Sequence, residues 1–315
     1  MKELRIVFMG TPEFAVGVLD ALVKQHYNIV GVLTAPDRPA GRGRKLKESA
    51  LKKYASEKEL TILQPTNLKS EEFLKTLENL KANLQIVVAF RMLPKKVWAM
   101  PTYGTFNLHA SLLPQYRGAA PINWAIMNGE TKTGVTTFFI DEKIDTGAII
   151  LQEEAPIYEN DNAENLHDRL MDLGGALVLK TVKRIKEGNF ETTLQEDTED
   201  LKLAHKLNKD TCKIDWDSPL KEVYDFIRGL SPYPAAWSTL HNKDEKLLTK
   251  IFKTKIQIEK HDLKPGTILC TKKEMKVALS NGYLNLLEIQ LQGKKRMAVR
   301  DVLNGLEITQ NAYFA

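Results

Sequence analysis

The segment 106-FNLHASLLPQYRGAAP-121, with the later segment 139-FIDEKIDTGAIILQ-152, decides both the fold and the candidate site of this chain of 315 residues. Asn107 and His109 are two residues apart, so their side chains share one face of a β-strand. Asp145 follows a second apolar strand, predicted over residues 135–140. Because buried polar side chains near strand ends are costly unless they are paired, three of them in one place indicate a site. An amide and an imidazole can hold an oxyanion, and a carboxylate can orient the imidazole or take a proton, so the trio suits acyl transfer to an amine.

Short apolar runs alternate with helical patterns in the first half of the chain. Strands are predicted over residues 4–9, 29–33 and 84–89, and helices over residues 70–82 and 162–186. Such alternation is typical of βαβ units, so we expect an α/β, Rossmann-like domain with a parallel sheet. The glycine pattern G-x-G-x-x-G is absent after the first strand, and we therefore expect no NAD binding.

The pattern changes after a polar, acidic stretch at residues 187–200. A helix is predicted over residues 220–228, and short strands follow over residues 236–240, 247–255, 267–270, 275–278 and 283–290. Short strands at this spacing favour a small β-barrel. We predict a catalytic domain at residues 1–188, a linker at 189–206 and a C-terminal domain at 207–315.

The composition is that of an ordinary globular protein, and its charge is unevenly distributed. Residues 207–315 hold 18 Lys and Arg against 13 Asp and Glu, which is the whole formal net charge of +5, because the remainder holds 27 of each. This asymmetry favours a polyanionic partner, although solvated lysine-rich faces are also common. With only two cysteines, no apolar run of membrane length and no signal-peptide pattern, we expect a cytoplasmic protein without membrane association.

The motifs together resemble the folate-dependent formyltransferases, and in particular those that act on methionyl-tRNA. The resemblance rests on N-x-H-x-S-L-L-P from Asn107, on D-x-G from Asp145, and on matches in order along nearly the whole chain, which include 8-FMGTP-12, 36-PDRPAGRG-43 and 227-IRGLSPYPAAW-237. It implies an enzyme that moves a formyl group from 10-formyltetrahydrofolate to the α-amino group of methionine on initiator tRNA, in translation initiation and one-carbon metabolism. It also implies an OB-like C-terminal barrel that binds tRNA.

The same resemblance assigns roles to particular residues. Asn107 and His109 would donate to the oxyanion, and Asp145 would pair with His109 so that the imidazole stays a donor. The turn Ser111, Leu112, Leu113 and Pro114 would contact the folate. The basic loop that contains Arg38, Arg42 and Lys45 would contact the acceptor end of the tRNA.

Some expectations concern absences and alternatives. We expect no metal and no obligate protein partner, and we expect Arg117 and Gly118 to hold the shape of their loop. Arg91 stands where many family members have glycine, which is a departure from the family pattern beside the folate pocket. Two alternatives remain: a folate-dependent transferase or hydrolase that acts on a small substrate such as an amino sugar nucleotide, and a non-catalytic RNA-binding protein. The basic loop disfavours the first, and the intact trio disfavours the second.

Overall fold

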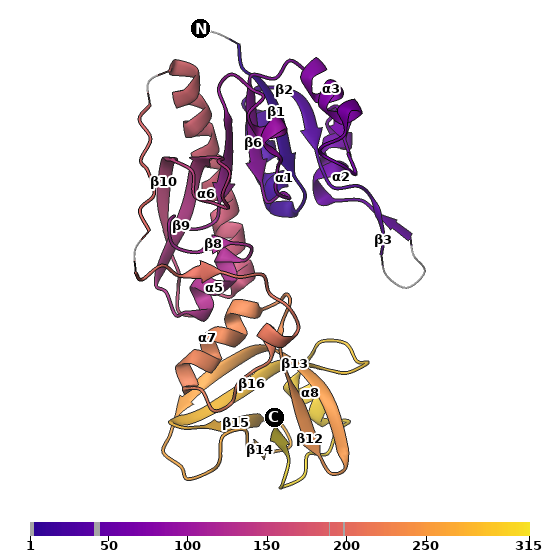
Figure 1. The fold of residues 1–315 in the computed structure, drawn as a ribbon. Coiled ribbons are helices and arrows are strands. Elements are labelled where there is room, and N and C mark those ends of the chain that lie inside the picture. Colours follow the sequence, from indigo (N-terminus) through magenta and orange to yellow (C-terminus); the bar gives the residue numbers. More distant parts are fainter. Residues whose placement is uncertain (1–2, 41–44, 189, 198) are drawn as a thin grey trace. The chain divides into compact units, whose positions relative to one another are not determined.

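The computed structural model describes residues 3–40, 45–188, 190–197 and 199–315, which form two compact units (Figure 1). The first unit is Met1–Gly118, Thr133–Pro156 and His167–Leu203, and the second is Ala119–Lys132, Ile157–Leu166 and Ala204–Ala315. The second unit therefore includes two segments from the range 1–188 that was predicted to form the catalytic domain. The domain boundaries at residues 188 and 206 stay a prediction.

A mixed sheet forms the centre of the first unit. Its strand order is β10-β9-β7-β6-β1-β2-β5. The strands and helices of this part of the chain are β1 (Arg5–Gly10), α1 (Glu13–Lys24), β2 (Asn28–Leu33), β3 (Arg38–Ala40), β4 (Lys45–Lys47), α2 (Ala50–Glu57), β5 (Ile62–Leu63), α3 (Glu71–Asn79), β6 (Leu84–Val88), α4 (Lys95–Trp98), β7 (Thr105–His109), β8 (Arg117–Gly118), β9 (Lys132–Phe139), β10 (Ile149–Pro156), α6 (Ala163–Glu187) and β11 (Leu203–Ala204). Strands β5, β2, β1, β6 and β7 run parallel, and β9 is antiparallel to β7. The predicted Rossmann-like, mainly parallel sheet is confirmed.

Helices cover both faces of this sheet. On one face, α3 packs Phe73 and Leu77 against the odd-numbered side chains Val7 and Met9 of β1. On the other face, α6 lies so close to β7 that a Cβ on Gly174 would stand 2.7 Å from Leu108 Cδ2. Strand β7 is therefore fixed by its apolar face, which leaves Asn107 and His109 on the opposite face.

The basic segment after β2 is more ordered at its ends than the sequence predicts. The sequence predicts a basic loop around Arg38, Arg42 and Lys45, but β3 and β4 pair as an antiparallel hairpin with Arg38 opposite Lys47. Ser49 caps the following helix α2, because its side chain accepts a hydrogen bond from Lys52 N at 3.0 Å. The hairpin is thus anchored to a capped helix.

A curved antiparallel sheet forms the second unit, with strand order β14-β15-β16-β13-β12-β18 and β17 beside β16. Its elements are α5 (Pro121–Met127), the 3-10 turn η1 (Asp210–Cys212), α7 (Leu220–Leu230), β12 (Ala236–Asn242), β13 (Glu245–Ile258), β14 (Ile268–Cys270), β15 (Met275–Leu279), β16 (Gly282–Leu291), β17 (Met297–Ala298), α8 (Val299–Leu303) and β18 (Tyr313–Phe314). A bridge between Thr267 and Tyr313 nearly closes the sheet into a barrel. This confirms the predicted barrel, which packs apolar side chains of α7 into its core.

Helix α5 packs against α7 through a close approach at Gly229. A Cβ there would stand 2.7 Å from Met127 Cγ, and the Gly229 carbonyl accepts a hydrogen bond from Asn123 Nδ2 at 2.7 Å. The buried Arg228 pairs with Asp225 at 2.7 Å and donates to the Asp161 carbonyl at 2.8 Å. These interactions explain why a segment from the first half of the chain belongs to the second unit.

Candidate active site

Strand β7 brings two of the predicted residues to one place. It lies between β6 and β9, with Asn107 opposite Val87 on one side and Phe138 on the other. His109 is the last residue of the strand and is only 6% exposed. Both side chains therefore stand at the carboxyl end of the parallel strands, where ligands bind in open α/β sheets.

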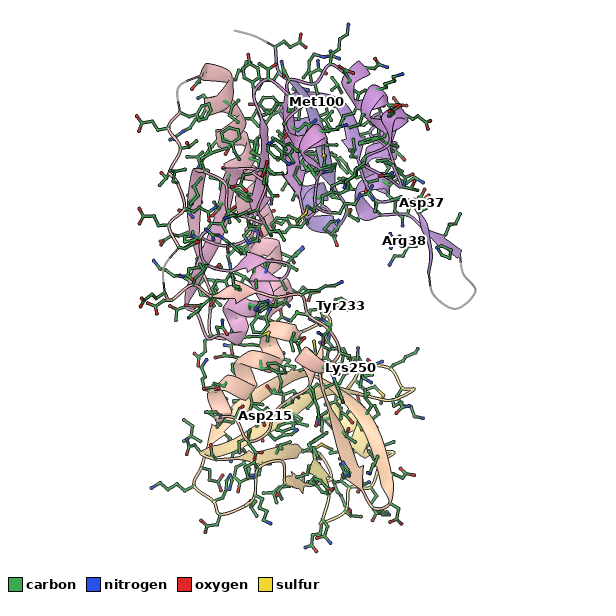
Figure 2. The ribbon with its side chains drawn as sticks, viewed as in Figure 1. Asp37, Arg38, Met100, Asp215, Tyr233 and Lys250 are labelled. Carbon is green, nitrogen blue, oxygen red and sulfur yellow. The ribbon has the colours of Figure 1, made fainter. Side chains whose placement is uncertain are left out.

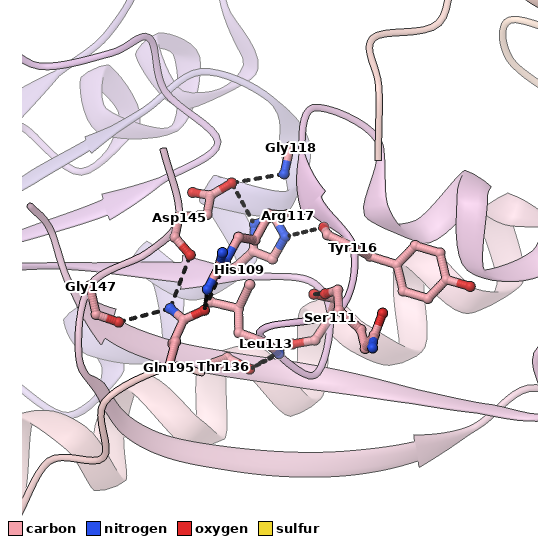
Figure 3. A network of polar contacts seen from close by, with 11 residues as sticks. His109, Ser111, Leu113, Tyr116, Arg117, Gly118, Thr136, Asp145, Gly147 and Gln195 are labelled. Atoms are coloured by element: carbon pink, nitrogen blue, oxygen red, sulfur yellow. Dashed lines mark hydrogen bonds and ion pairs between the residues drawn. The ribbon is translucent and has the colours of Figure 1, made fainter. Parts of the chain in front are cut away.

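Both ring nitrogens of His109 face protein acceptors (Figure 3). Nε2 donates to the Tyr116 carbonyl oxygen at 2.8 Å, and Nδ1 lies 3.8 Å from Asp145 Oδ2. The carboxylate thus orients the imidazole from one side, while the backbone fixes it from the other. In this arrangement the Nε2–H group already donates to the Tyr116 carbonyl. It could donate to an oxyanion only by sharing its hydrogen between the two acceptors, or after the ring rotates away from Tyr116.

Asp145 lies in the turn between β9 and β10, six residues after Phe139 ends β9, and not at a strand end. Its φ is +57°, a conformation that residues with a side chain rarely adopt, and Tyr116 has a φ of +62°. Asp145 Oδ2 accepts a hydrogen bond from Gly118 N at 2.9 Å. The contact between Asp145 and His109 therefore depends on the unusual backbone conformations of Tyr116 and Asp145, which the surrounding structure must stabilise.

Asn107 carries a buried oxygen, Oδ1, that has no hydrogen-bond partner among the described residues. Leaving such an atom unpaired costs on the order of 1–3 kcal/mol. A hydrogen-bond donor of a bound ligand would remove this cost. The unpaired Asn107 oxygen therefore suits a substrate with a polar reacting centre.

The turn after His109 is held mainly by its own hydrogen bonds. Ser111 is fully buried, and its Oγ donates to the Gln115 carbonyl at 2.7 Å. Thr136 Oγ1 donates to the Ser111 carbonyl at 2.6 Å and accepts from Leu113 N at 3.2 Å. Because the Ser111 hydroxyl and the Leu113 side chain are turned inward, only Leu112, Pro114 and the backbone of this turn are left for contact with a ligand.

Sequence reasoning missed Gln195, which supports both loops of the site. Its Oε1 accepts from Arg117 Nε and Nη2 at 3.0 and 2.9 Å, and its Nε2 donates to the carbonyls of Asp145 and Gly147 at 2.9 and 2.8 Å. Arg117 holds its loop as expected. Gln195 gave no signal because it lies in the polar stretch that we had predicted to be a linker.

A cleft of about 740 Å³ opens at the carboxyl end of β6, lined by residues 66–69 and 91–96. Four cationic residues belong to its lining, Lys69, Arg91, Lys95 and Lys96, of which Lys95 pairs with Glu142 at 2.7 Å. Arg91 donates to the carbonyls of Pro65 and Thr66 (3.1 Å for the latter), so it holds a neighbouring loop. Burial, and then the like charge of Arg38, lower the pKa of Arg91.

The residues predicted to contact tRNA differ in their exposure and in whether they already pair with an acidic side chain. Arg38 is exposed at the root of the β3–β4 hairpin (Figure 2). Lys45 begins β4, and Arg42 lies outside the described residues. In the C-terminal unit, Lys294 and Lys295 are exposed, whereas Arg296 pairs with Glu288 and lies 4.5 Å from the Phe252 ring centroid.

The described residues contain neither a membrane span nor a metal-binding cluster. No helix in the described ranges is long and apolar enough to cross a membrane. No group of three or more His, Cys, Asp or Glu side chains in that part of the chain is placed to hold a metal ion.

Comparison with known proteins gives consistent matches over the whole chain. A formyl transferase profile matches residues 4–182, and a profile of the formyl transferase C-terminal domain matches residues 206–307. The chain is 61% identical over 312 residues to the methionyl-tRNA formyltransferase of Flavobacterium johnsoniae, with 99% of each covered. It is 54% identical over 314 residues to that of Bacteroides fragilis, with 98% of this chain and 97% of the relative covered.

Solved structures share the fold at low identity. HypX from Aquifex aeolicus in complex with tetrahydrofolic acid aligns with a TM-score of 0.65 at 17% identity, over 96% of this chain and 47% of that one, so this chain spans about half the length of HypX. WlaRD, a sugar 3N-formyl transferase solved with dTDP and 5-N-formyl-THF, aligns with a TM-score of 0.65 at 20% identity, over 94% of this chain and 100% of that one.

Proposed function

The chain belongs to the formyl transferase family, and from this premise we infer that it transfers the formyl group of 10-formyltetrahydrofolate to the α-amino group of methionine on initiator tRNA. The observation that carries the inference is the 61% identity to a methionyl-tRNA formyltransferase over 99% of both chains. The product is the formylated initiator used in translation. Because this substrate is made and used in the cytoplasm, we propose that location for the enzyme.

Asn107 is proposed to act on the reacting centre directly. The amine attacks the formyl carbon, and charge develops on the formyl oxygen. When this tetrahedral intermediate collapses, the bond from the formyl carbon to N10 of the folate breaks, the proton lost by the amine ends on N10, and tetrahydrofolate leaves. The Asn107 amide has one oxygen without a partner among the described residues, so it is free to meet the substrate. With its nitrogen it donates to the oxyanion, and with its oxygen it accepts from the attacking amine; either interaction strengthens as charge develops.

His109 and Asp145 are proposed to act as a pair. Asp145 Oδ2, 3.8 Å from Nδ1, holds the ring from one side, so Nε2–H can donate to the oxyanion when it is shared between the substrate and the Tyr116 carbonyl. Asp145 can also take the proton that the amine loses, through a water.

The folate is proposed to bind at the turn formed by Ser111, Leu112, Leu113 and Pro114 and in the cleft beside Arg91. Its carboxylates suit the lysines of that cleft.

The tRNA is proposed to meet two basic regions. The basic segment that contains Arg38, Arg42 and Lys45 would contact the acceptor end, and the C-terminal barrel would bind along the phosphates. Arginine and lysine position a nucleic acid through its backbone, and their contribution falls with salt.

Incubating the purified protein with charged initiator tRNA and formylated folate tests this function. We expect formylmethionyl-tRNA, with little product from charged elongator tRNA. A parallel arm with an amino sugar nucleotide as acceptor tests the small-substrate alternative. Product from that arm alone would contradict the proposal.

A further inference from the structure

Gln195 uses its whole side-chain amide to join two loops of the candidate site (Figure 3). Nε2 donates both of its hydrogens, to the carbonyls of Asp145 and Gly147 at 2.9 and 2.8 Å. Oε1 accepts two hydrogen bonds from Arg117, at 3.0 and 2.9 Å. An amide offers two donors and two acceptor positions, and all four are satisfied here.

The two loops that Gln195 joins are the ones that hold His109. The Tyr116 carbonyl, next to Arg117, accepts from His109 Nε2 at 2.8 Å. Asp145 Oδ2 faces His109 Nδ1 at 3.8 Å and accepts from Gly118 N at 2.9 Å. Gln195 is therefore linked to both partners of the His109 ring. It binds Arg117, which follows Tyr116, and it binds the carbonyl of Asp145.

The backbone at both places needs external support. Tyr116 and Asp145 have φ values of +62° and +57°, which L residues rarely adopt unless their surroundings hold them. The Asp145 carbonyl, at the centre of this turn, is one of the two that Gln195 Nε2 binds. Without that hydrogen bond the turn would relax and move the carboxylate away from His109.

Gln195 is itself fixed by its own segment. Two residues earlier, Thr193 pairs with Ile149 through two backbone hydrogen bonds of 2.9 and 2.8 Å. Two residues later, Asp197 Oδ1 accepts from Arg117 Nη1 at 2.6 Å. The segment is thus tied to β10 on one side of Gln195 and to β8 on the other.

We propose that Gln195 is a positioning residue for the transfer reaction: it holds the Tyr116–Gly118 loop and the Asp145–Gly147 turn in register, so that His109 stays between its two partners. This role rests on the proposed function. It places part of the predicted linker in the support of the active site, and it assigns Arg117 to the same support.

Gln195→Glu is the sharpest test, because it keeps the size of the side chain and its pairing with Arg117. A carboxylate has no donor for the two carbonyls and repels their oxygens. We expect kcat to fall by roughly 10- to 100-fold, because small errors in placement cost rate, while KM for tRNA and for folate changes by less than about 3-fold. Gln195→Ala should behave in the same way. Glu196→Gln, an exposed neighbour, is the matched control and should retain full activity.

A second measurement separates this proposal from the proposed function. The ring nitrogens of His109, observed by NMR without substrate, should shift in Gln195→Glu and remain unchanged in Glu196→Gln. If kcat stays within about 2-fold of the parent, or if the His109 resonances do not move, the positioning role is wrong. If the parent fails to formylate charged tRNA, the proposed function fails, and the NMR arm still decides whether Gln195 orders the site. If Gln195→Ala does not fold, the isosteric Gln195→Glu provides the answer.

Discussion

At the scale of single residues, the candidate active site contains groups that lower the stability of the fold. Asn107 Oδ1 is buried without a partner in the described chain, and Asp145 and Tyr116 occupy the left-handed region of backbone conformation. Such features persist when a substrate uses them, and they should be removable with a gain in stability.

Asn107→Leu should therefore separate stability from activity. Removing the unpaired oxygen should raise the free energy of unfolding by about 1 kcal/mol or leave it unchanged, whereas kcat should fall by roughly 100-fold or more because the proposed oxyanion donor is removed. Thr133→Val is the matched control. It removes another buried oxygen without a partner among the described residues and should stabilise the protein with unchanged kcat. A Leu variant with normal turnover would remove Asn107 from the mechanism.

The His109–Asp145 pair should be sensitive to charge rather than to shape. Asp145→Asn keeps an oxygen for Gly118 N but removes the charge facing His109, so we expect kcat to fall by roughly 100-fold with tRNA affinity preserved. His109→Ala should lose at least as much. Asp168→Asn disrupts an exposed His–Asp pair, with His167, and should be silent in the same kinetic assay. Equal effects in the two Asp variants would mean that the charge at Asp145 has no special role.

At the scale of elements, the β3–β4 hairpin depends on the interactions at its root. Asp37 Oδ2 pairs with Lys52 of α2, and its Oδ1 accepts from Gln64 Nε2 at 2.8 Å. The hydrogen bond from Lys52, followed by that from Gln64, lowers the pKa of Asp37, and the same ion pair raises the pKa of Lys52. A lowered carboxyl pKa means that the ion pair is present at neutral pH and disappears only as the pH falls through that lowered value.

Asp37→Ala should release the hairpin without unfolding the unit. We expect kcat/KM for charged tRNA to fall by about 10-fold with a melting temperature within a few degrees of the parent, because a single ion pair that is still partly open to solvent adds little stability. The effect of Asp37 should be constant between about pH 5 and pH 9, where both partners stay charged. Glu48→Gln removes only the outer partner of Lys52 and serves as the control. A loss of turnover in Glu48→Gln as large as in Asp37→Ala would contradict this account.

The comparison of sequence with structure is also clearest for elements. Apolar runs such as residues 84–89 predicted their strands within one or two residues, because burial on both faces leaves a strong pattern. The spacing of Asn107 and His109 also placed them on one face of a strand. Gln195 left no such pattern, since its position is set by hydrogen bonds to residues distant in the sequence, such as Asp145. The strands β3 and β4 left none either, because three residues each are too few to show an apolar alternation. The inclusion of Ala119–Lys132 in the second unit depends likewise on packing at Gly229.

At the scale of the whole molecule, the formal net charge does not tell how many positive side chains are available to bind a polyanion. The formal +5 lies entirely in residues 207–315, but part of the positive charge there is already neutralised within the unit. Arg296 pairs with Glu288, and Lys243 pairs with Glu307 at 3.0 Å. A residue paired in this way releases fewer counterions when tRNA binds than an exposed lysine does.

The last prediction follows from this difference. Lys294→Gln with Lys295→Gln should weaken binding to all tRNAs alike and reduce the slope of log affinity against log salt by about 1 for each phosphate that is no longer neutralised. Arg296→Gln should leave the slope nearly unchanged, because its charge is already paired with Glu288, and should instead lower the melting temperature slightly as the stacking on Phe252 disappears. Filter binding over a salt series, with Tm measured in parallel, distinguishes the two. If the double lysine variant keeps the parental slope, the phosphate-binding role of this turn is wrong; if Arg296→Gln changes the slope as much as the lysines do, its pairing with Glu288 does not persist when tRNA binds.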